Sequence, residues 1–264
     1  MDDYAGALRL DGQGFVVLGA GGGGIGEQVC TALSQLGARL LCVDCSAKEA
    51  ESVARRVNGV PCVANAIERD GMARIFDEAK SNFGASLSGV VDVIGVPIVM
   101  PVTQFDDEKL AKQFDTVLRH VILAIQIGAP LIEANGGGSM TFIGSVAGIR
   151  SIPNQTMYGA AKAALHHTVR TAAHELGPSG VRVNAVAPGF VRTPSLLKLI
   201  PEESWQRIAD TNPMRRVADP SDVARAVLFL ASDLARYVTG NVMMLDGGMT
   251  LVAALPPYQR LNGP

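Results

Sequence analysis

Short runs of apolar and β-branched residues alternate along the chain with longer segments in which apolar residues recur at helical spacing. Strands alternating with helices predict βαβ units and a parallel sheet covered on both faces. Because such crossovers are right-handed, the pattern predicts a doubly wound sheet of seven strands. The predicted strands are residues 14–19, 39–44, 60–64, 89–94, 138–144, 181–187 and 242–246.

Composition limits the class of protein. The chain has 264 residues, of which 48% are hydrophobic and 18% charged, enough to bury a substantial core. We expect a single domain over residues 1–264, because neither a low-complexity linker nor an internal repeat interrupts the pattern. The formal net charge of −2 provides no basic surface for nucleic acid or anionic membranes, so neither is an expected partner.

Three features bear on the compartment. The apolar stretch 121–132 is shorter than the roughly 20 residues that span a bilayer, so no transmembrane helix is predicted. The N-terminal sequence "MDDYAGALRLDG" lacks the layout of a signal peptide, which favours the cytoplasm. Cys42 and Cys45 form a C-x-x-C, but no second pair follows at zinc spacing, so we expect reduced cysteines and no metal site.

One predicted turn is unusually rich in glycine. Residues 18–26 read "LGAGGGGIG", directly after a predicted strand. Glycine loses more conformational freedom on folding than any other residue, so such a cluster indicates a sharp turn or a close approach. A pyrophosphate could lie against this backbone at the N-terminus of the next helix. The expected contacts are Gly19, Gly23, Gly24, Ile25 and Gly26.

An acidic residue follows the glycine-rich turn at the spacing expected for binding a ribose. Asp44 ends the second predicted strand, 18 residues after Gly26, where a carboxylate can accept hydrogen bonds from the adenosine ribose. A 2′-phosphate would meet a like charge there, and Cys45 and Ser46 supply no cation. The sequence therefore favours NAD(H) over NADP(H); the alternative is that Asp44 only caps a loop.

The segment 139–162, "SMTFIGSVAGIRSIPNQTMYGAAK", contains candidate acid–base chemistry. Tyr158 and Lys162 are four residues apart and therefore share one face of a helix. A nearby ammonium stabilises phenolate and lowers a tyrosine pKa toward the working range. Ser145 leaves the fifth strand at the edge where open α/β sheets bind ligands, so its hydroxyl could hold a substrate oxygen beside Tyr158.

Together these motifs resemble the short-chain dehydrogenase/reductase family over residues 12–248. The resemblance implies a Rossmann-type sheet, with Tyr158 as general acid/base, Lys162 as the residue that lowers its pKa and binds the nicotinamide ribose, and Ser145 positioning the substrate oxygen. The family's enoyl reductases space Tyr and Lys more widely, which favours alcohol and ketone chemistry here. The matching segments are "GAGGGGIG" (19–26), Ser145 with Tyr158, "YGAAK" (158–162), "VRVNAVAPGFVRTP" (181–194) and "YVTGNVMMLDGG" (237–248). The same resemblance adds Asn65, Ala66, Gly95, Pro188, Gly189, Val191 and Thr193 to the cofactor site.

The chain departs from the family pattern at three places. Gly19 and Ala20 stand at the first two positions of the glycine motif, and "DVIG" (92–95) replaces an asparagine-containing motif. Val117 aligns with a family asparagine that links the lysine to solvent through water, unless the ungapped alignment is one helical turn off. We therefore expect the proton relay through Lys162 to use another route, with His120 or the ribose 2′-hydroxyl and bulk water as candidates.

The substrate side looks apolar. The segment 188–218 is the one long irregular insertion and is expected to form a lid; the alternative is a surface excursion with one amphipathic helix. Arg150 and Arg192 are the cations nearby, and neither is expected to clamp an anion. His166 and His167 are expected to pack against a neighbouring helix or subunit. The expected pocket wall comprises Val96, Ile98, Met100, Ile149, Ile152, Gln155, Phe190, Leu196, Leu197, Leu199 and Trp205.

These observations predict an NAD(H)-dependent oxidoreductase acting on a hydrophobic secondary alcohol or ketone of alicyclic, aromatic or steroid-like type. Wide apolar faces on the helical segments 106–133 and 156–176 suggest a homodimer or homotetramer. Two alternatives stay open: a non-catalytic dinucleotide-binding sensor, and an NADPH-dependent reductase of acyl-carrier-bound ketones.

Overall fold

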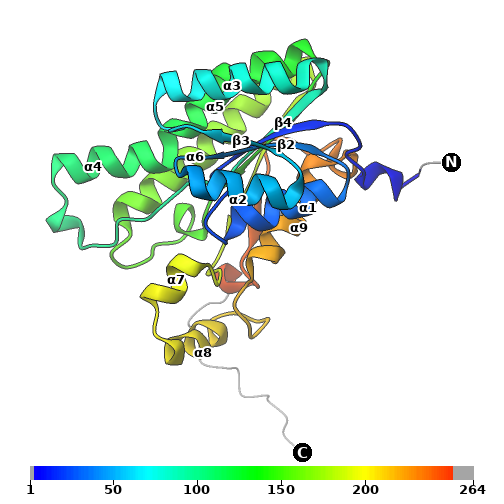
Figure 1. Ribbon diagram of the computed structural model, residues 1–264. Helices are drawn as coiled ribbons and strands as arrows, with labels where there is room; N and C mark the ends of the chain where they lie inside the picture. The colour runs from blue at the N-terminus through cyan, green and yellow to red at the C-terminus, as the bar shows by residue number, and fades with distance from the viewer. Residues whose placement is uncertain (1–2, 252–264) are drawn as a thin grey trace, which may run out of the picture.

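The computed structural model describes residues 3–251 and contains one sheet of seven parallel strands (Figure 1). Its strand order is β3-β2-β1-β4-β5-β6-β7, so β1 lies between β2 and β4 and the winding reverses at that point. Ligands of doubly wound sheets bind at such a reversal, outside the carboxyl ends of the strands. The strands are β1 Gly14–Leu18, β2 Arg39–Asp44, β3 Val60–Val63, β4 Leu87–Asp92, β5 Gly138–Ile143, β6 Val181–Pro188 and β7 Val242–Leu245.

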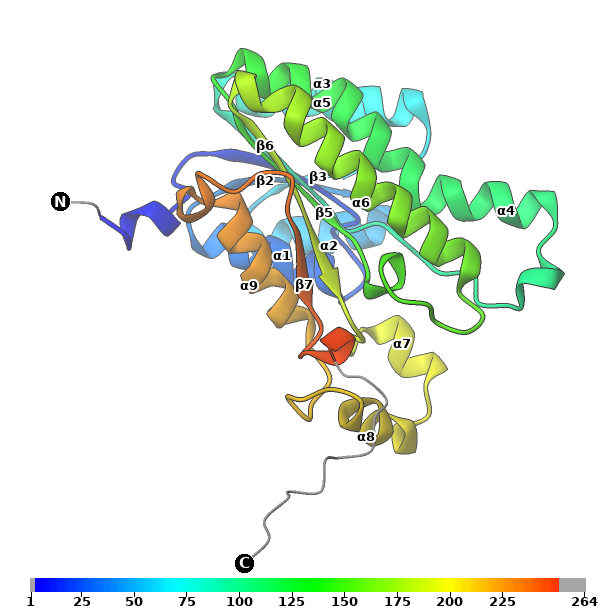
Figure 2. The same ribbon diagram turned by 180° about the vertical axis from the view of Figure 1, so that it is seen from behind.

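Helices cover both faces of the sheet. In Figures 1 and 2, α3, α5 and α6 lie on one face, and α1, α2 and α9 lie on the other. The helix α4 extends from the first group beyond the sheet, and α7 and α8 lie past the carboxyl ends of the strands. The helices are α1 Ile25–Gln35, α2 Ala47–Val57, α3 Arg69–Phe83, α4 Asp107–Phe114, α5 His120–Ala134, α6 Thr156–Leu176, α7 Pro194–Leu199, α8 Glu202–Asp210 and α9 Pro220–Ala231.

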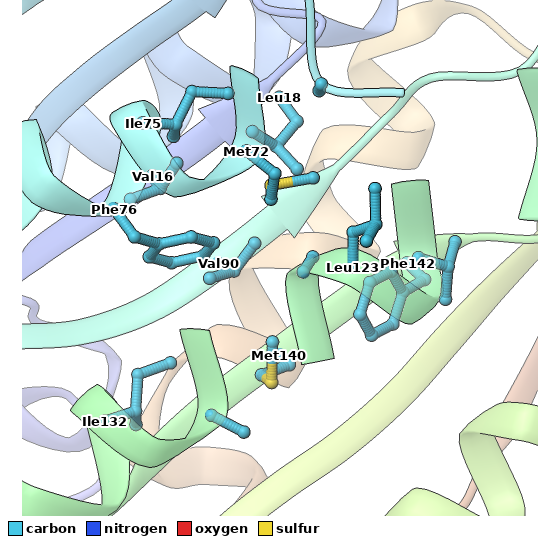
Figure 3. Packing of buried hydrophobic residues seen from close by; sticks show 14 of the residues in the cluster. Val16, Leu18, Met72, Ile75, Phe76, Val90, Leu123, Ile132, Met140 and Phe142 are labelled. Atoms are coloured by element: carbon cyan, nitrogen blue, oxygen red, sulfur yellow. The ribbon is translucent and has the colours of Figure 1, made fainter. Parts of the chain in front are cut away.

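Burial on both faces explains why the strands read as continuous apolar runs. Successive side chains of a strand point to opposite faces, so β1 places Val16 and Leu18 in the core under α3 and α5, and Phe15 and Val17 in the core under α1 and α9. Figure 3 shows the first core, where Phe76 packs beside Val16 and Val90. The predicted sheet is thereby confirmed; β4 differs most, beginning at Leu87 rather than residue 89.

The helical stretch Asp107–Ala134 agrees with the helical segment that the sequence pattern indicated over residues 106–133. It joins α4, a π-helical segment Asp115–Arg119 and α5 into 28 residues with mean hydropathy 1.5, which by length and composition alone could cross a membrane. In the structure, however, Val121, Leu123 and Ile132 pack in the core against the sheet. Packing within the molecule therefore covers part of this apolar helix, whereas Leu110 and Ile122 remain exposed.

The long insertion after β6 forms two helices, α7 and α8, rather than the single helix of the alternative interpretation. A bridge between Val191 and Ala218 closes the base of this segment. Trp205 of α8 is 2% exposed, with the Arg192 guanidinium 5.1 Å from its ring centre. Trp205 is therefore buried rather than part of an open pocket wall, which corrects the expectation for this residue.

Candidate active site

The turn between β1 and α1 is built so that backbone reaches solvent at the carboxyl edge of the sheet. Gly19 has φ +77°, a conformation that side chains disfavour. A Cβ on Gly26 would lie 2.0 Å from the Gly19 carbonyl oxygen, so only glycine fits. The helix α1 starts at Ile25, and no side chain caps its N-terminus at Gly24. Its first N–H groups are therefore available to an anion.

Two carboxylates, not one, hold this turn. Asp44 Oδ2 accepts a hydrogen bond from the Gly21 N–H at 3.1 Å, and Glu49 Oε2 accepts one from the Gly22 N–H at 3.1 Å. Asp44 Oδ1 also accepts from the Ser46 N–H at 2.9 Å, so Asp44 orders both turns. Sequence reasoning missed Glu49; its place in the first turn of α2 after Asp44 was the available signal.

The residues predicted near the adenine lie after β3, farther along the sheet edge. The Asn65 amide donates to Glu68 Oε1 at 2.9 Å, and its oxygen accepts from the Ile67 N–H at 3.3 Å. The Asn65 side chain therefore orders its own loop. Ala66 is buried in the core, so its side chain is not free to meet a ligand.

Ser145, Tyr158 and Lys162 come together at the carboxyl end of β5. Ser145 follows that strand and caps the 3₁₀ turn Val146–Gly148, while Tyr158 and Lys162 lie one turn apart on α6. The Lys162 Nζ is 5.7 Å from the centre of the Tyr158 ring and donates to the Ile143 carbonyl at 2.6 Å. Lys162 is 1% exposed, so its ammonium is held beneath the site by the strand end.

The electrostatics of these groups differ from those in water. Burial raises the pKa of Tyr158, and a hydrogen bond with Ser145 lowers it in part. Burial lowers the pKa of Lys162 to about 8, opposed by the Asp92 carboxylate. An ammonium with this pKa remains mostly charged at neutral pH and can release its proton within the working range.

Glycines let the site close over the lysine and the glycine-rich turn. A Cβ on Gly95 would lie 2.9 Å from the Lys162 Nζ, so the backbone after β4 passes directly beside the ammonium. On the other side, a Cβ on Gly24 would come 3.9 Å from the Thr193 side chain. The segment after β6 therefore lies against the turn after β1.

The remaining predicted residues after β6 sit at the start of the long insertion. Pro188 ends β6 and is buried, and Gly189 donates its N–H to the Leu245 carbonyl at 3.0 Å. Val191 is buried, and Thr193 caps α7 through its side-chain oxygen. The structure thus brings this segment, the glycine-rich turn and the Ser145 loop to one edge of the sheet.

His166 lies in a different place from the one expected from the sequence. Its Nε2 accepts the Ser145 backbone N–H at 3.4 Å, and a Cβ on Gly144 or Gly148 would lie 2.4 or 2.7 Å from its ring. Burial above all, then the charges of Lys162 and Arg170, lowers the pKa of His166 to about 4. The expectation that His166 packs against a neighbouring helix or subunit is wrong, since it packs under the Ser145 loop; His167 is exposed.

Val117 and His120 occupy different environments on the helix before β5. Val117 is fully buried within the π-helical segment. His120 lies three residues later, and its Nδ1 is 2.5 Å from Asp92 Oδ2. Among the described residues of this helical stretch, two polar side chains are buried near Val117: Gln113, which bonds the loop after β4, and His120, which bonds Asp92.

Around the mouth of the site, apolar side chains are exposed on three loops. The loops after β4 and β5 are joined by a hydrogen bond from the Met100 N–H to the Asn154 carbonyl at 2.8 Å. The two nearby cations are engaged: Arg150 donates to the Met249 carbonyl and Arg192 to Glu202. The exposed apolar residues include Val96, Val99, Ile149, Leu197 and Leu199.

A cavity of about 590 Å³ lies beside this mouth, between α8 and the end of β7. Ile208, Met214 and Met244 are among its mostly apolar lining residues, whereas Ser145, Tyr158 and Lys162 do not line it. Of the residues expected in the pocket wall, Phe190 lines this cavity.

Comparisons with known proteins agree with this arrangement. A family model described as "Enoyl-(Acyl carrier protein) reductase" matches residues 19–250. The chain is 32% identical to the 3-oxoacyl-(acyl-carrier-protein) reductase FabG of Thermotoga maritima, over 92% of this chain and 100% of that protein. It is 32% identical to the 7alpha-hydroxysteroid dehydrogenase of Escherichia coli K12 (91% and 95%) and 34% identical to the galactitol 2-dehydrogenase (L-tagatose-forming) of Cereibacter sphaeroides (94% and 99%).

Solved structures show the same likeness. A 7 alpha-hydroxysteroid dehydrogenase complexed with NADH and 7-oxo glycochenodeoxycholic acid superposes with a TM-score of 0.88 at 30% identity, covering 94% of this chain and 98% of that one. The structure of gox2181 gives a TM-score of 0.90 at 28% identity, with 95% and 100% coverage. The chain therefore belongs to the short-chain dehydrogenase/reductase family of oxidoreductases.

Proposed function

We propose that this protein is an NAD(H)-dependent oxidoreductase that interconverts a secondary alcohol and a ketone. The observation that supports this most directly is the grouping of Ser145, Tyr158 and Lys162 beside the glycine-rich turn, at the carboxyl edge of the sheet. A base with a nearby cation and a hydroxyl that can hold an oxygen are the elements that proton transfer at an alcohol requires.

The cofactor site fits a nicotinamide dinucleotide. The free N-terminus of α1 and the glycine backbone of the turn suit a pyrophosphate. Asp44 and Glu49 place two carboxylates where a ribose 2′-phosphate would need a cation, which supports NAD(H) over NADP(H). When bound, the nicotinamide supplies the hydride acceptor or donor. The proposed contacts are Gly19, Gly23, Gly24, Ile25, Gly26, Asp44, Asn65, Ala66, Gly95, Tyr158, Lys162, Pro188, Gly189, Val191 and Thr193.

The three side chains divide the acid–base work. The Tyr158 oxygen takes a proton from the alcohol in one direction and returns it to the ketone oxygen in the other. Since burial raises the pKa of Tyr158, phenolate needs the positive charge of Lys162 and the hydrogen bond with Ser145 to form at working pH. Ser145 would hold the substrate oxygen within reach of Tyr158.

For the substrate, we infer a hydrophobic alcohol or ketone. Exposed Val96, Ile149 and Leu199 border the mouth, and Arg150 and Arg192 are already paired. The E. coli relative is named for a hydroxysteroid, which supports a steroid-like ligand, whereas the C. sphaeroides relative is named for galactitol.

A second candidate function is reduction of an acyl-carrier-bound ketone. The name of the T. maritima relative favours it. The acidic pair at the ribose position and the engagement of both arginines near the mouth favour the first candidate. A non-catalytic sensor fits less well, because it would not need Ser145, Tyr158 and Lys162 in one place.

We further propose that the protein is cytoplasmic and forms a homodimer or homotetramer.

The test is absorbance at 340 nm with NAD and a panel of hydrophobic secondary alcohols, including hydroxysteroids. Turnover that disappears in Tyr158→Phe and persists in Tyr237→Phe, a fully exposed tyrosine, supports the proposal. Turnover only with NADPH and acyl-carrier ketones would replace it with the second candidate. Tight NADH binding without turnover of any alcohol would favour the sensor.

A further inference from the structure

Asp92 and His120 form a buried pair that the proposed reaction does not use directly. Asp92 ends β4 and is 1% exposed; His120 begins α5 and is 1% exposed. The His120 Nδ1 lies 2.5 Å from Asp92 Oδ2, and Asp92 Oδ1 accepts the Ile94 N–H at 3.0 Å. Both carboxylate oxygens are thus held by donors from different segments.

The position of this pair relates it to Lys162. Asp92 is three residues before Gly95, whose backbone passes beside the Lys162 Nζ. The Asp92 carboxylate favours the charged form of Lys162, against the burial that lowers its pKa. The other titratable groups near the ammonium are Tyr158 on the same helix and His166, whose own pKa is lowered in part by Lys162.

Such a pair is costly to bury, which indicates that it has a role in the site. An ionised carboxylate in the interior is strongly disfavoured without partners, and removing one partner of a buried pair leaves an uncompensated group. Within the described residues, the His120 Nε2 has no hydrogen-bond partner, so the ring contributes its one bond to Asp92. His120 also directly follows the π-helical segment Asp115–Arg119, an irregularity that is frequent at functional sites.

We propose that Asp92 and His120 act together as a positioning pair for Lys162: the carboxylate supplies the counter-charge of the buried ammonium, and the imidazole holds the carboxylate in place. This inference rests on the proposed role of Lys162 beside Tyr158. It assigns the charge balance of the site to two residues that are 28 positions apart in the chain.

The consequence concerns the ionisation of Lys162. Without the Asp92 charge, burial acts on the ammonium unopposed, so Lys162 loses its proton at a lower pH. The phenolate of Tyr158 then loses its stabilising cation in the range where the enzyme would work. Asp92→Asn removes the charge while the amide keeps both contacts: its oxygen can still accept the Ile94 N–H, and its NH2 group can donate to His120 Nδ1 when the imidazole takes its other tautomer.

The experiment is an NMR titration of carbon-13-labelled lysine Cε signals, which needs neither substrate nor turnover. The chain has six lysines, and the Lys162 signal is identified as the one missing from Lys162→Arg. In the unaltered protein this signal should titrate near pH 8. Asp92→Asn should raise the acid dissociation constant of Lys162 by about threefold or more. The control is Asp222→Asn: Asp222 lies on α9 and pairs with Arg216, so its substitution should leave the Lys162 titration unchanged.

His120→Leu tests the second half of the pair. Without the imidazole that holds it, the Asp92 carboxylate is no longer fixed in place near the ammonium, so the Lys162 titration should shift in the same direction. Asp92→Asn combined with His120→Leu should add little to Asp92→Asn alone. An unchanged Lys162 titration in a folded Asp92→Asn protein overturns the proposal, and so does a full shift there with none in His120→Leu.

Two safeguards keep the result interpretable. If either single variant fails to fold, the double variant Asp92→Asn with His120→Asn supplies a neutral amide pair. A shift of the Lys162 titration in that protein supports the proposal, and an unchanged titration overturns it. Failure of the proposed function is recognised separately, because the absence of alcohol turnover in the unaltered protein leaves the lysine titration measurable.

Discussion

The backbone N–H of Ser145 donates to the Nε2 of His166 at 3.4 Å, and the ring fits there because Gly144 and Gly148 lack side chains. His166 lies on α6, one turn after Lys162. The loop that holds the serine is thus tied to the helix that holds the tyrosine and lysine. Since the pKa of His166 is lowered to about 4, the ring is neutral at physiological pH and its Nε2 can accept.

Replacing this acceptor should affect both stability and turnover. In His166→Leu the Ser145 N–H loses its partner, which should lower the free energy of unfolding by about 1–3 kcal/mol. We expect kcat to fall at least about tenfold, because a displaced Ser145 no longer holds the substrate oxygen in line. Denaturant unfolding and steady-state kinetics measure the two effects. The exposed His167→Leu is the control, and equal kcat values in both variants would contradict the role of His166.

The lowered pKa of Lys162 has a consequence for stability. Between the pKa of about 8 that Lys162 has in the folded protein and the ordinary lysine value of 10.5, the unfolded chain binds more protons, so this residue makes stability rise with pH across that window. The effect of Lys162→Met on the free energy of unfolding should therefore be more stabilising at pH 7 than at pH 10.5, by about 1–3 kcal/mol. Urea unfolding of both proteins at several pH values gives the difference. Lys198→Met, on the exposed face of α7, should show no such trend.

Cofactor preference should follow the two carboxylates at the glycine-rich turn. Asp44→Asn with Glu49→Gln removes the charges that face a 2′-phosphate, so NADPH affinity should rise about tenfold or more while NADH affinity changes less. Fluorescence titration with both cofactors measures this. The matched control is Glu51→Gln, because Glu51 is an exposed carboxylate on α2, the helix that also carries Glu49. NADPH binding by the unaltered protein as tight as NADH binding would refute the assignment.

The glycine-rich turn should tolerate no side chain at its closest approach. In Gly26→Ala the new methyl would meet the Gly19 carbonyl oxygen at 2.0 Å, so the turn must move and NADH binding should be lost or weakened at least about a hundredfold. Gly177→Ala places its methyl in open space in a helical conformation and should leave binding unaltered. Titration of NADH fluorescence distinguishes the two, and intact binding in Gly26→Ala would show that the turn can relax.

The sheet and the motifs of the site could be predicted because each depends on neighbours in the sequence. A strand buried on both faces must be apolar at successive positions, as β1 is, so its run is visible without knowing its partners. Tyr158 and Lys162 share a helix face because of their spacing alone. The turn at Gly19–Gly26 is equally local, since its backbone conformation demands glycine wherever the rest of the chain lies.

Other parts of the site arise from packing between distant segments, and no local pattern marks them. His166 meets Ser145 across 21 residues, and Glu49 meets Gly22 across 27. Trp205 looked like an exposed lid residue, yet the insertion folds over it, because a large apolar side chain gains most by leaving water. The sequence by itself determined the order of the elements and which side chains could do chemistry. Only the tertiary structure decided which neutral, charged and buried groups surround them, because those surroundings depend on how the helices pack on the sheet.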